Sequence, residues 1–119
     1  MSERGNFLFK NRIIFPITNL RNETVGFGGR ALDDFGPKYL NTAESSIYRK
    51  NRTLYFTSEF LSDLKKKKFV ILVEGYFDVI AFNKLGFYNV ASPSGTALTV
   101  QQINLPVSYT HLTLPTIGC

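Results

Sequence analysis

The feature that most limits how this chain can fold is an unbroken apolar run, Phe69–Val73, which ends abruptly at Glu74. A run of this length and composition is typical of a strand that is buried on both faces of a sheet. The next segment, Tyr76–Leu85, has apolar residues at helical spacing and is followed by Gly86, placed as a C-cap. A second apolar run, Phe87–Ala91, follows. Together these segments predict a strand, helix, strand unit with a right-handed crossover.

The first part of the chain has a different pattern. Arg12–Ile17 is β-branched and aromatic, residues 18–23 are rich in turn formers, and Thr24–Arg30 is again typical of extended chain. These segments predict an antiparallel hairpin. Residues 31–52 show no sustained period, so we expect irregular structure that crosses a surface. The predicted fold class is therefore mixed α/β, with an irregular antiparallel part followed by a parallel unit.

A short amphipathic helix is predicted between these two parts. It covers Thr57–Lys68, with Ser58 as its N-cap and four lysines at its end, where positive charge favours the helix. We interpret the four lysines as a solvated helix end rather than as a DNA contact.

Composition narrows the class of protein. The 119 residues carry a net charge of +5, which favours a polyanionic partner without implying sequence readout. Apolar residues make up 44% of the chain, enough to pack a core. The single cysteine cannot form an internal disulfide, and no segment is long and apolar enough to cross a bilayer. With no signal peptide at the start, the sequence predicts a cytoplasmic protein without a membrane partner.

Two carboxylates are predicted at one edge of the parallel unit. Glu74 follows the first strand, and Asp78 should project from the first helical turn towards the same edge, with Gly75 permitting a tight turn between them. Carboxylate oxygens suit Mg²⁺, which would neutralise charge in phosphoryl transfer. The alternative is that both carboxylates only complement the dipole of the helix.

Four motifs in this chain resemble one protein family. Val73–Asp78, VEGYFD, resembles the VEGYxD signature of the Toprim domain, a fold that bacterial primases share with topoisomerases. Three further segments resemble bacterial-type DNA primases specifically and follow in that family's order: RIIFPI at 12–17, GFGGR at 26–30, and PKYLN at 37–41 followed by Lys50 and Leu54-Tyr55. The resemblance covers Phe7 to Asn104. Several motifs in order are more specific than a lone glycine-rich pattern.

The resemblance implies an enzyme, a nucleotidyltransferase that makes short RNA primers on single-stranded DNA from ribonucleoside triphosphates. It implies Glu74 as the catalytic acid or base and as a ligand of Mg²⁺ or Mn²⁺, with Asp78 as a second ligand. It also implies a basic cleft that holds template or nucleotide phosphates, a role that suits arginine and lysine. The residues of that cleft would be Arg30, Lys38, Asn41, Lys50 and Gly75.

The same resemblance implies parts that this sequence lacks. The family continues to a DxD pair of metal-binding carboxylates, and it has a zinc module and a domain that binds the replicative helicase. His111 and Cys119 offer only two of the about four ligands of a structural zinc site. We therefore expect a fragment that is inactive alone and has an incomplete, Rossmann-like Toprim unit.

Three segments are expected along the chain. Residues 1–64 would belong to the amino-terminal subdomain of the primase core, and residues 65–106 to a truncated Toprim domain. The stretch Val107–Cys119 contains VSYTHLTLPT, which resembles translated sequencing adaptor, and we interpret it as a non-native tail. A natural divergent tail is the alternative.

Two other functions remain open at this stage. Another Toprim enzyme, such as a topoisomerase or a recombination protein, would share only the VEGYxD part. A non-catalytic module would bind single-stranded nucleic acid through the same cations and through aromatic stacking, without needing metal or Glu74. We interpret most of the phenylalanines as core residues instead.

Three smaller motifs have structural interpretations. The glycines of GFGGR lack the setting of a phosphate-binding loop, so we expect them to bend a strand. Asp33-Asp34 lies in a polar stretch and predicts a turn rather than a metal pair. Gly95-Thr96 matches the family loop beside the site, although a plain strand-to-helix connection capped by Thr99 explains it nearly as well.

Overall fold

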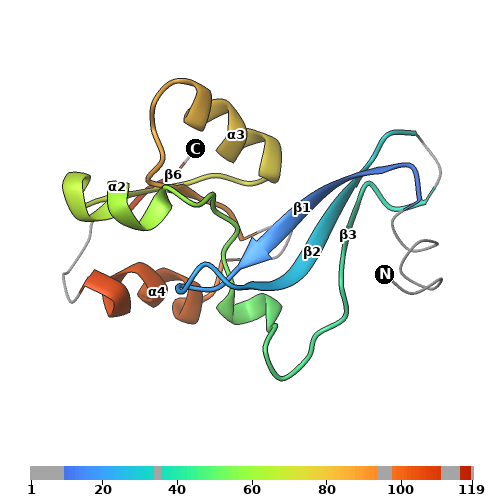
Figure 1. Ribbon diagram of the computed structural model, residues 1–119, viewed down its shortest axis with the longest axis horizontal. Coiled ribbons are helices and arrows are strands. Elements are labelled where there is room, and N and C mark those ends of the chain that lie inside the picture. The colour runs from blue at the N-terminus through green and yellow to red at the C-terminus, as the bar shows by residue number, and fades with distance from the viewer. Residues whose placement is uncertain (1–9, 34–35, 94–97, 111–115, 119) are drawn as a thin grey trace.

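The computed structural model describes residues 10–33, 36–93, 98–110 and 116–118 (Figure 1). It contains two three-stranded sheets, an antiparallel one in the order β1-β2-β3 and a parallel one in the order β5-β4-β6. We call residues 10–56 the hairpin half and residues 60–105 the parallel half. In Figure 1 the long strands β1 and β2 extend to one side, while α2, α3 and α4 gather on the other. The predicted mixed α/β class is confirmed.

The hairpin forms where β-branched and aromatic residues predict it. β1 (Arg12–Thr18) pairs antiparallel with β2 (Thr24–Ala31). Asn19 organises the turn, because its Oδ1 accepts hydrogen bonds from the backbone N–H groups of Arg21 and Glu23 at 2.8 and 3.1 Å. This is the local side-chain bonding that makes asparagine a frequent turn residue.

The glycines of β2 admit close neighbours. A Cβ on Gly28 would lie 2.1 Å from the Oη of Tyr76, and a Cβ on Gly26 would lie 2.7 Å from the Oγ1 of Thr42. Along residues 26–31 the pairing with β1 stays in register. For Gly28, close approach of a ring rather than the predicted bending therefore explains the glycine.

Residues 31–52, predicted as irregular, include two short elements. β3 (Tyr39–Asn41) is a third strand antiparallel to β2, and η1 (Lys50–Arg52) is one turn of 3-10 helix. β3 forms because β2 has a second edge whose backbone groups need partners: the N–H of Ala31 donates to the carbonyl of Lys38 at 2.8 Å. A strand of three residues leaves no periodic signal, so the sequence pattern missed it.

The parallel half contains the predicted strand, helix, strand unit. It consists of β4 (Val70–Leu72), α3 (Tyr76–Lys84) and β5 (Val90–Ala91), with β5 parallel to β4. β6 (Thr116–Gly118) pairs with the other edge of β4, so β4 is the central strand, as its apolar run predicts. β6 belongs to the segment for which the sequence predicts a non-native tail, and that assignment stays a prediction.

The helix before β4 begins later than its sequence predicts. α2 covers Phe60–Lys67, and its N-cap is Glu59, which makes no capping bond through its side chain. The predicted cap at Ser58 is therefore wrong. The N–H of Phe60 instead donates to the carbonyl of Thr57 at 3.0 Å, so a backbone turn leads into the helix.

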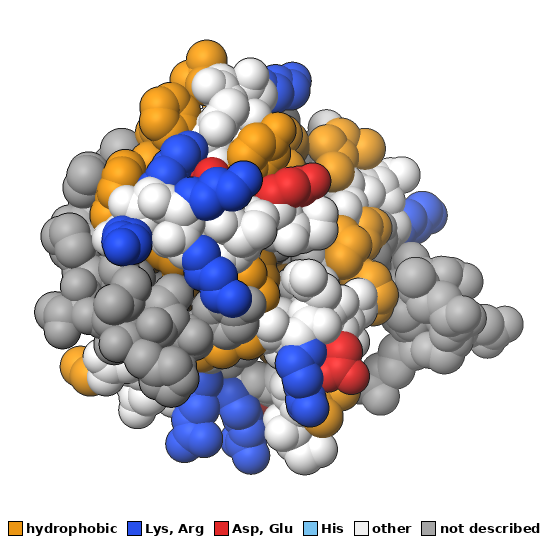
Figure 2. Space-filling view, turned by 60° about the vertical axis from the view of Figure 1, so that its left-hand side comes forward, with side chains coloured by type: hydrophobic (Ala, Val, Ile, Leu, Met, Phe, Trp, Pro, Cys, Tyr) orange, Lys and Arg blue, Asp and Glu red, His pale blue; other side chains and the backbone are white. Residues whose placement is uncertain are grey.

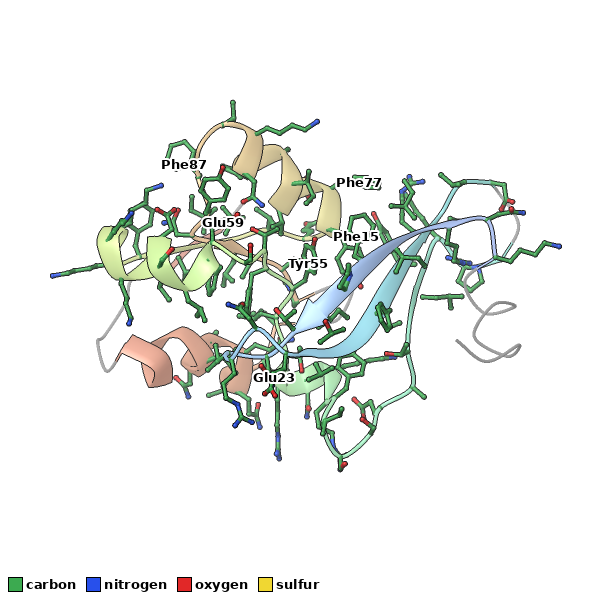
Figure 3. All side chains as sticks on the ribbon, viewed as in Figure 1. Phe15, Glu23, Tyr55, Glu59, Phe77 and Phe87 are labelled. Atoms are coloured by element: carbon green, nitrogen blue, oxygen red, sulfur yellow. The ribbon has the colours of Figure 1, made fainter. Side chains whose placement is uncertain are left out.

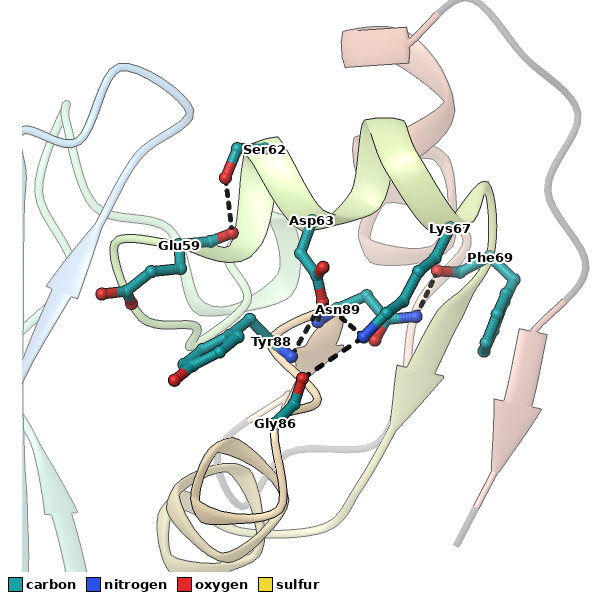
Figure 4. Close-up of polar contacts among 8 residues, drawn as sticks. All are labelled: Glu59, Ser62, Asp63, Lys67, Phe69, Gly86, Tyr88 and Asn89. Atoms are coloured by element: carbon teal, nitrogen blue, oxygen red, sulfur yellow. Dashed lines mark hydrogen bonds and ion pairs between the residues drawn. The ribbon is translucent and has the colours of Figure 1, made fainter.

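One lysine of the predicted solvated run is built into the fold (Figure 4). The Oδ2 of Asp63 accepts hydrogen bonds from the Nζ of Lys67 at 2.9 Å and from the N–H groups of Tyr88 and Asn89 at 2.9 and 3.0 Å. We call Asp63, Lys67, Tyr88 and Asn89 the Asp63 cluster. Because these two N–H groups bond a side chain, β5 is shorter than predicted. The solvated interpretation is therefore wrong for Lys67, whereas the other three lysines are exposed.

The predicted cap at Thr99 is confirmed. α4 (Val100–Thr110) begins with a reciprocal pair in which the Oγ1 of Thr99 accepts the N–H of Gln102 and the Oε1 of Gln102 accepts the N–H of Thr99. Gln102 is fully buried, and its Nε2 donates to the carbonyls of Lys50 and Thr53, each at 2.9 Å. Gly95-Thr96 lies outside the described residues.

Two clusters of buried side chains hold the halves together. One lies between the hairpin and α3 and contains Phe15, Ile17, Tyr48, Tyr55, Ile71, Val73, Tyr76, Val79 and Val90. The other lies beneath α2 and contains Leu54, Phe56, Phe60, Leu61, Leu64, Val70 and Ala91. Several phenylalanines are thus core residues, as expected. Within the described ranges, no helix has the length and apolar character needed to cross a membrane.

Candidate functional site

The predicted catalytic carboxylate stands just past β4. Glu74 is exposed, while its backbone carbonyl accepts a 2.9 Å hydrogen bond from the Oγ of Ser92, which follows β5. The N–H of Val73 donates to the carbonyl of Ala91 at 3.0 Å. These bonds tie the carboxyl ends of the two parallel strands together. Glu74 therefore has a fixed backbone and a carboxylate open to solvent.

Asp78 lies in the first turn of α3, on the same edge of the sheet. Its Oδ2 accepts the N–H of Gly75 at 3.2 Å, so one carboxylate oxygen caps the helix. This supports the alternative in which Asp78 complements the helix terminus. Among the residues that the structure describes, no group of three or more His, Cys, Asp or Glu side chains could hold a metal. Metal binding by Glu74 and Asp78 stays a prediction.

The backbone conformation of Gly75 does not require glycine. Its φ is −136° and its ψ is 171°, an extended conformation that any residue adopts. A Cβ there would lie 3.7 Å from both the Oδ2 of Asp78 and the Oη of Tyr39, which is ordinary contact. The chain does bend at residues 74–75, but this bend does not depend on the conformational freedom of glycine. A small residue does leave open space beside the first turn of α3.

Arg30, on β2, lies against the start of α3. Its Cζ is 5.6 Å from the centre of the Phe77 ring, and its Nη1 donates to the carbonyl of Ala31 at 2.7 Å. The Nε of Arg30 is buried and has no hydrogen-bond partner among the described residues. The guanidinium is thus packed against the Phe77 ring on one side. Lys38 is exposed, and its Nζ lies 5.9 Å from the ring centre of Tyr39.

Asn41 and Lys50 line one small hollow. They come from β3 and η1, and the hollow is completed by Ile17, Tyr48, Thr53, Tyr55 and Pro93. The structure therefore brings together two residues that are nine positions apart in the chain. It also places Asn41 beside α3, because the Oη of Tyr76 donates to the Oδ1 of Asn41.

Tyr76 is the residue that pattern reading missed. It is 1% exposed, its ring stacks on Phe15 with centres 4.6 Å apart, and Tyr55 meets it edge-on at 4.9 Å. Figure 3 shows Phe15, Tyr55 and Phe77 near β1 and α3, and the ring of Phe15 also meets those of Tyr55 and Phe77 edge-on. The ring of Tyr76 occupies the space that a side chain at position 28 would take. The sequence feature that could have indicated Tyr76 was its position in the VEGYFD motif, between Gly75 and Asp78.

Burial perturbs two phenols of this aromatic cluster. Burial, followed by the nearby Tyr76 and Glu44, raises the pKa of Tyr48 to about 12. The pKa of Tyr55 is also raised, first by burial and then by Tyr76. Both phenols stay neutral at pH 7, so the positive charges of Arg30 and Lys50 are not offset by phenolates.

Arg12 also helps to build this region, although the sequence patterns did not indicate it. Its Nη2 donates to the carbonyl of Pro37 at 2.6 Å, and its Nη1 to the carbonyls of Lys38 and Gly29 at 3.3 and 3.4 Å. Arg12 thus holds the backbone that presents Lys38. The sequence showed only an arginine at the start of a strand. Of the Asp33-Asp34 pair, Asp33 lies in a bend, consistent with the predicted turn, and Asp34 lies outside the described residues.

Family models match both halves of the chain. The model described as "DNA primase catalytic core, N-terminal domain" matches residues 2–61, and the model described as "Toprim domain" matches residues 68–112. The first match covers residues that a topoisomerase or a recombination protein is not expected to share. The comparison therefore favours the primase interpretation over other Toprim enzymes.

Individual relatives agree with the family models. The DNA primase of Rickettsia felis is 46% identical over 97 residues, which are 82% of this chain and 16% of that protein. The solved Aquifex aeolicus primase, with its zinc binding and RNA polymerase domains, superposes with a TM-score of 0.79 at 41% identity, covering 87% of this chain and 26% of that one. The DnaG primase catalytic domain bound to single-stranded DNA superposes with a TM-score of 0.76 at 37% identity, covering 92% and 34%.

Proposed function

The chain belongs to the family of bacterial-type DNA primases, and from this premise we propose that it forms part of an enzyme that synthesises short RNA primers on single-stranded DNA. It spans 16% of the Rickettsia felis relative and 21% of the Aquifex aeolicus one, so the activity is proposed for the whole protein to which this core belongs. The observation that carries the proposal is the position of Glu74 at the carboxyl edge of β4, facing solvent on a fixed backbone.

Glu74 and Asp78 are proposed to act on the reacting groups. Both are oxygen donors at the edge where ligands gather in parallel sheets, and this donor set fits a hard divalent cation. When bound, Mg²⁺ or Mn²⁺ would neutralise charge that develops on the phosphates. Glu74 is proposed to move the proton of the attacking hydroxyl, while Asp78 keeps one oxygen for the N–H of Gly75 and offers the other.

The cations are proposed to hold phosphates of the template or of the incoming nucleotide. Arg30 and Asn41 lie against the first turn of α3, which carries Asp78, and Lys50 lines a hollow with Asn41. Lys38 adds an exposed charge, and Gly75 leaves room for a phosphate near the helix start. Arginine forks suit phosphate oxygens, and lysine adds a point charge.

The partners and the compartment follow from this proposal. Substrates would be ribonucleoside triphosphates, with single-stranded DNA as template and the RNA primer as product. The replicative helicase would be a further partner of the whole protein. A protein that acts on chromosomal DNA in bacteria works in the cytoplasm.

The proposal can be tested in a chimera. Residues 10–105 of this chain would replace the matching segment of the Aquifex aeolicus primase, and primer synthesis would be measured on single-stranded DNA. We expect synthesis that requires Mg²⁺ or Mn²⁺. Changing Glu74→Gln should lower the rate by about a hundredfold or more, because the proton acceptor and a ligand charge are lost.

A matched control separates this effect from general loss of charge. Glu59→Gln removes an exposed carboxylate at the start of α2. The side chain of Glu59 makes no capping bond, so this change should leave the rate unchanged. Equal activity of the Glu74→Gln chimera and its parent would refute the proposed role of Glu74. Template binding that survives in every variant, with no metal dependence and no synthesis, would favour the non-catalytic binding module.

A further inference from the structure

A second concave site lies on the molecule, outside the predicted cleft. It is a hollow of about 370 Å³ between the turn of the hairpin, the loop 46–53 and α4. Its volume falls in the range of small-molecule sites, roughly 300–1,000 Å³. None of the residues proposed above for catalysis or phosphate binding lines it. We call it the turn pocket.

Three arginines line the turn pocket: Arg21 from the hairpin turn, Arg49 from the segment before η1, and Arg52 from η1 itself. No Asp or Glu is among its described lining residues. Figure 2 shows basic side chains at several places on one face of the molecule, in its upper left part and along its lower edge. Arg21 forms an ion pair with Glu23 at 3.1 Å, but both side chains are largely exposed, at 83% and 61%, so the pair is weak and Arg21 can turn to another anion.

The rest of the pocket is apolar. Leu20 and Val25 come from the hairpin, Ile47 from the loop and Leu105 from α4. Ile47 is 68% exposed, so its side chain is accessible to a ligand in the hollow that it lines. An aliphatic surface beside guanidinium groups fits a ligand with an anionic part and a flat apolar part.

The pocket has a rigid frame. Gln102, fully buried, donates to the carbonyls of Lys50 and Thr53, and the Oγ1 of Thr99 donates to the carbonyl of Asn51 at 2.5 Å. These bonds fix the loop that carries two of the arginines to the start of α4. A site that exists before its ligand arrives loses less entropy on binding.

We propose that the turn pocket binds a nucleotide, with its phosphate on Arg21, Arg49 and Arg52 and its base against Ile47 and Leu105. Arginine forks match phosphate oxygens in pairs, and a base offers the flat face that the aliphatic surface accepts. The choice of a nucleotide among phosphate compounds rests on the proposed primase function. The same chemistry is present in a free nucleotide and in one nucleotide of a DNA strand.

The test uses the whole 119-residue chain with a chelator present, so that metal-dependent binding at Glu74 and Asp78 is silent. ADP and a short oligodeoxythymidylate are titrated separately, with affinity measured by calorimetry and the site located by methyl NMR shifts of Ile47 and Leu105. We expect saturable shifts at the methyl groups of both residues. The double change Arg49→Ala with Arg52→Ala should weaken binding by about tenfold or more.

The control pair is Lys66→Ala with Lys84→Ala, which removes the same charge from exposed positions on α2 and α3. This pair should leave the affinity nearly unchanged. Equal weakening by both pairs would mean unspecific attraction and would overturn the proposal, as would the absence of saturable shifts at Ile47 and Leu105.

The two ligands identify the source of the phosphate. Shifts with ADP support a free-nucleotide site, and shifts with the oligonucleotide alone support a nucleotide within a strand. Glu74→Gln should not change either affinity. Failure of primer synthesis in the chimera would therefore not contradict nucleotide binding in the turn pocket. Likewise, the absence of binding in the turn pocket would not contradict the primase proposal.

Discussion

The two halves of the molecule gain their order in different ways. In the parallel half, the partly buried carboxylate of Asp63 bonds a lysine and two backbone N–H groups, and so joins α2 to the end of the α3–β5 connection. In the hairpin half, side chains bond directly to the backbone of loops, as Arg12 and Asn19 do. The carboxylates lie on the regular half and the cations on the other.

This difference teaches where precision can be found in such a fold. Glu74 and Asp78, the carboxylates proposed to act on the reacting groups, lie just past the end of β4 and in the first turn of α3. The cations proposed to hold phosphates come from the hairpin half, where Arg30 lies on β2, Lys50 on η1 and Lys38 just before β3. Tyr76 joins the two arrangements, because it sits on α3 and donates to Asn41 on β3.

The largest effect is expected where the halves meet. Gly28→Ala would place a Cβ 2.1 Å from the Oη and 2.4 Å from the Cζ of a buried ring that cannot move away. We expect a loss of about 3 kcal/mol in the free energy of unfolding, measured by urea denaturation. Gly75→Ala is the matched control, with a nearest contact of 3.7 Å and an expected loss below about 1 kcal/mol. Similar losses from both changes would show that the halves are not tightly joined at Gly28.

The second test removes the polar tie of the parallel half. Asp63→Ala leaves the N–H groups of Tyr88 and Asn89 without their acceptor and Lys67 without its partner. The expected loss is about 2–3 kcal/mol, because these are hydrogen bonds to a charged group. Glu59→Ala, at the start of the same helix, should change stability much less. A small effect of Asp63→Ala would mean that regular elements alone order this half.

The same carboxylate makes the stability of the parallel half depend on pH. Burial by itself would raise the pKa of Asp63, but the hydrogen bonds from Lys67, Tyr88 and Asn89 outweigh it and lower the pKa. The contribution is therefore complete above the unfolded value of about 3.9 and is lost as the pH falls through the lower folded value. The gap in unfolding free energy between the wild type and Asp63→Asn should narrow over that acidic range. A constant gap would contradict the assignment.

A smaller loss is expected from the hydroxyl that joins the halves. Tyr76→Phe keeps the stacked ring and removes the bond to Asn41, for an expected loss of about 1 kcal/mol in thermal or urea unfolding. Tyr88→Phe is the control, since the phenol of Tyr88 makes no hydrogen bond among the described residues. If both changes cost the same, the hydroxyl of Tyr76 does not couple α3 to β3.

The smallest effect is expected at the hairpin turn. Arg21→Ala removes an ion pair whose partners are 83% and 61% exposed, so stability should change by at most about 0.5 kcal/mol. Added salt should reduce even that difference. A larger, salt-dependent loss would mean that surface charge orders the hairpin half to a degree that its contacts do not suggest.

Sequence patterns predicted the parallel half best. The run Phe69–Val73 indicated a central strand, and the apolar spacing of Tyr76–Leu85 indicated α3, because both signals depend on burial within one element. The position of Glu74 at the end of β4 followed directly. Ser58 was wrongly predicted as a cap because the composition of a helix start does not fix its first residue, and β5 is short because a side chain on α2 takes its amides.

Contacts between distant residues could not be predicted in this way. The residues near Gly28 in the chain do not indicate that the ring of Tyr76 will fill the space that a side chain at position 28 would take. The residues near Asp63 do not indicate that its carboxylate will also accept hydrogen bonds from the N–H groups of Tyr88 and Asn89. β3 was missed because its three residues form a strand only through pairing with β2. The family resemblance indicated which residues would form the proposed cleft. Only the structure showed that Asn41 and Lys50 line the same hollow.

The buried amide of Gln102 has a consequence for how the chain acquires its shape. It bonds carbonyls that are 52 and 49 positions earlier, at Lys50 and Thr53, so this loop cannot reach its final form by local folding alone. During synthesis on a ribosome, the loop would emerge well before the residue that fixes it. Closing so long a loop is entropically costly and is expected late in folding. The segment that carries Lys50 should therefore be among the last parts of the protein to gain protection from hydrogen exchange.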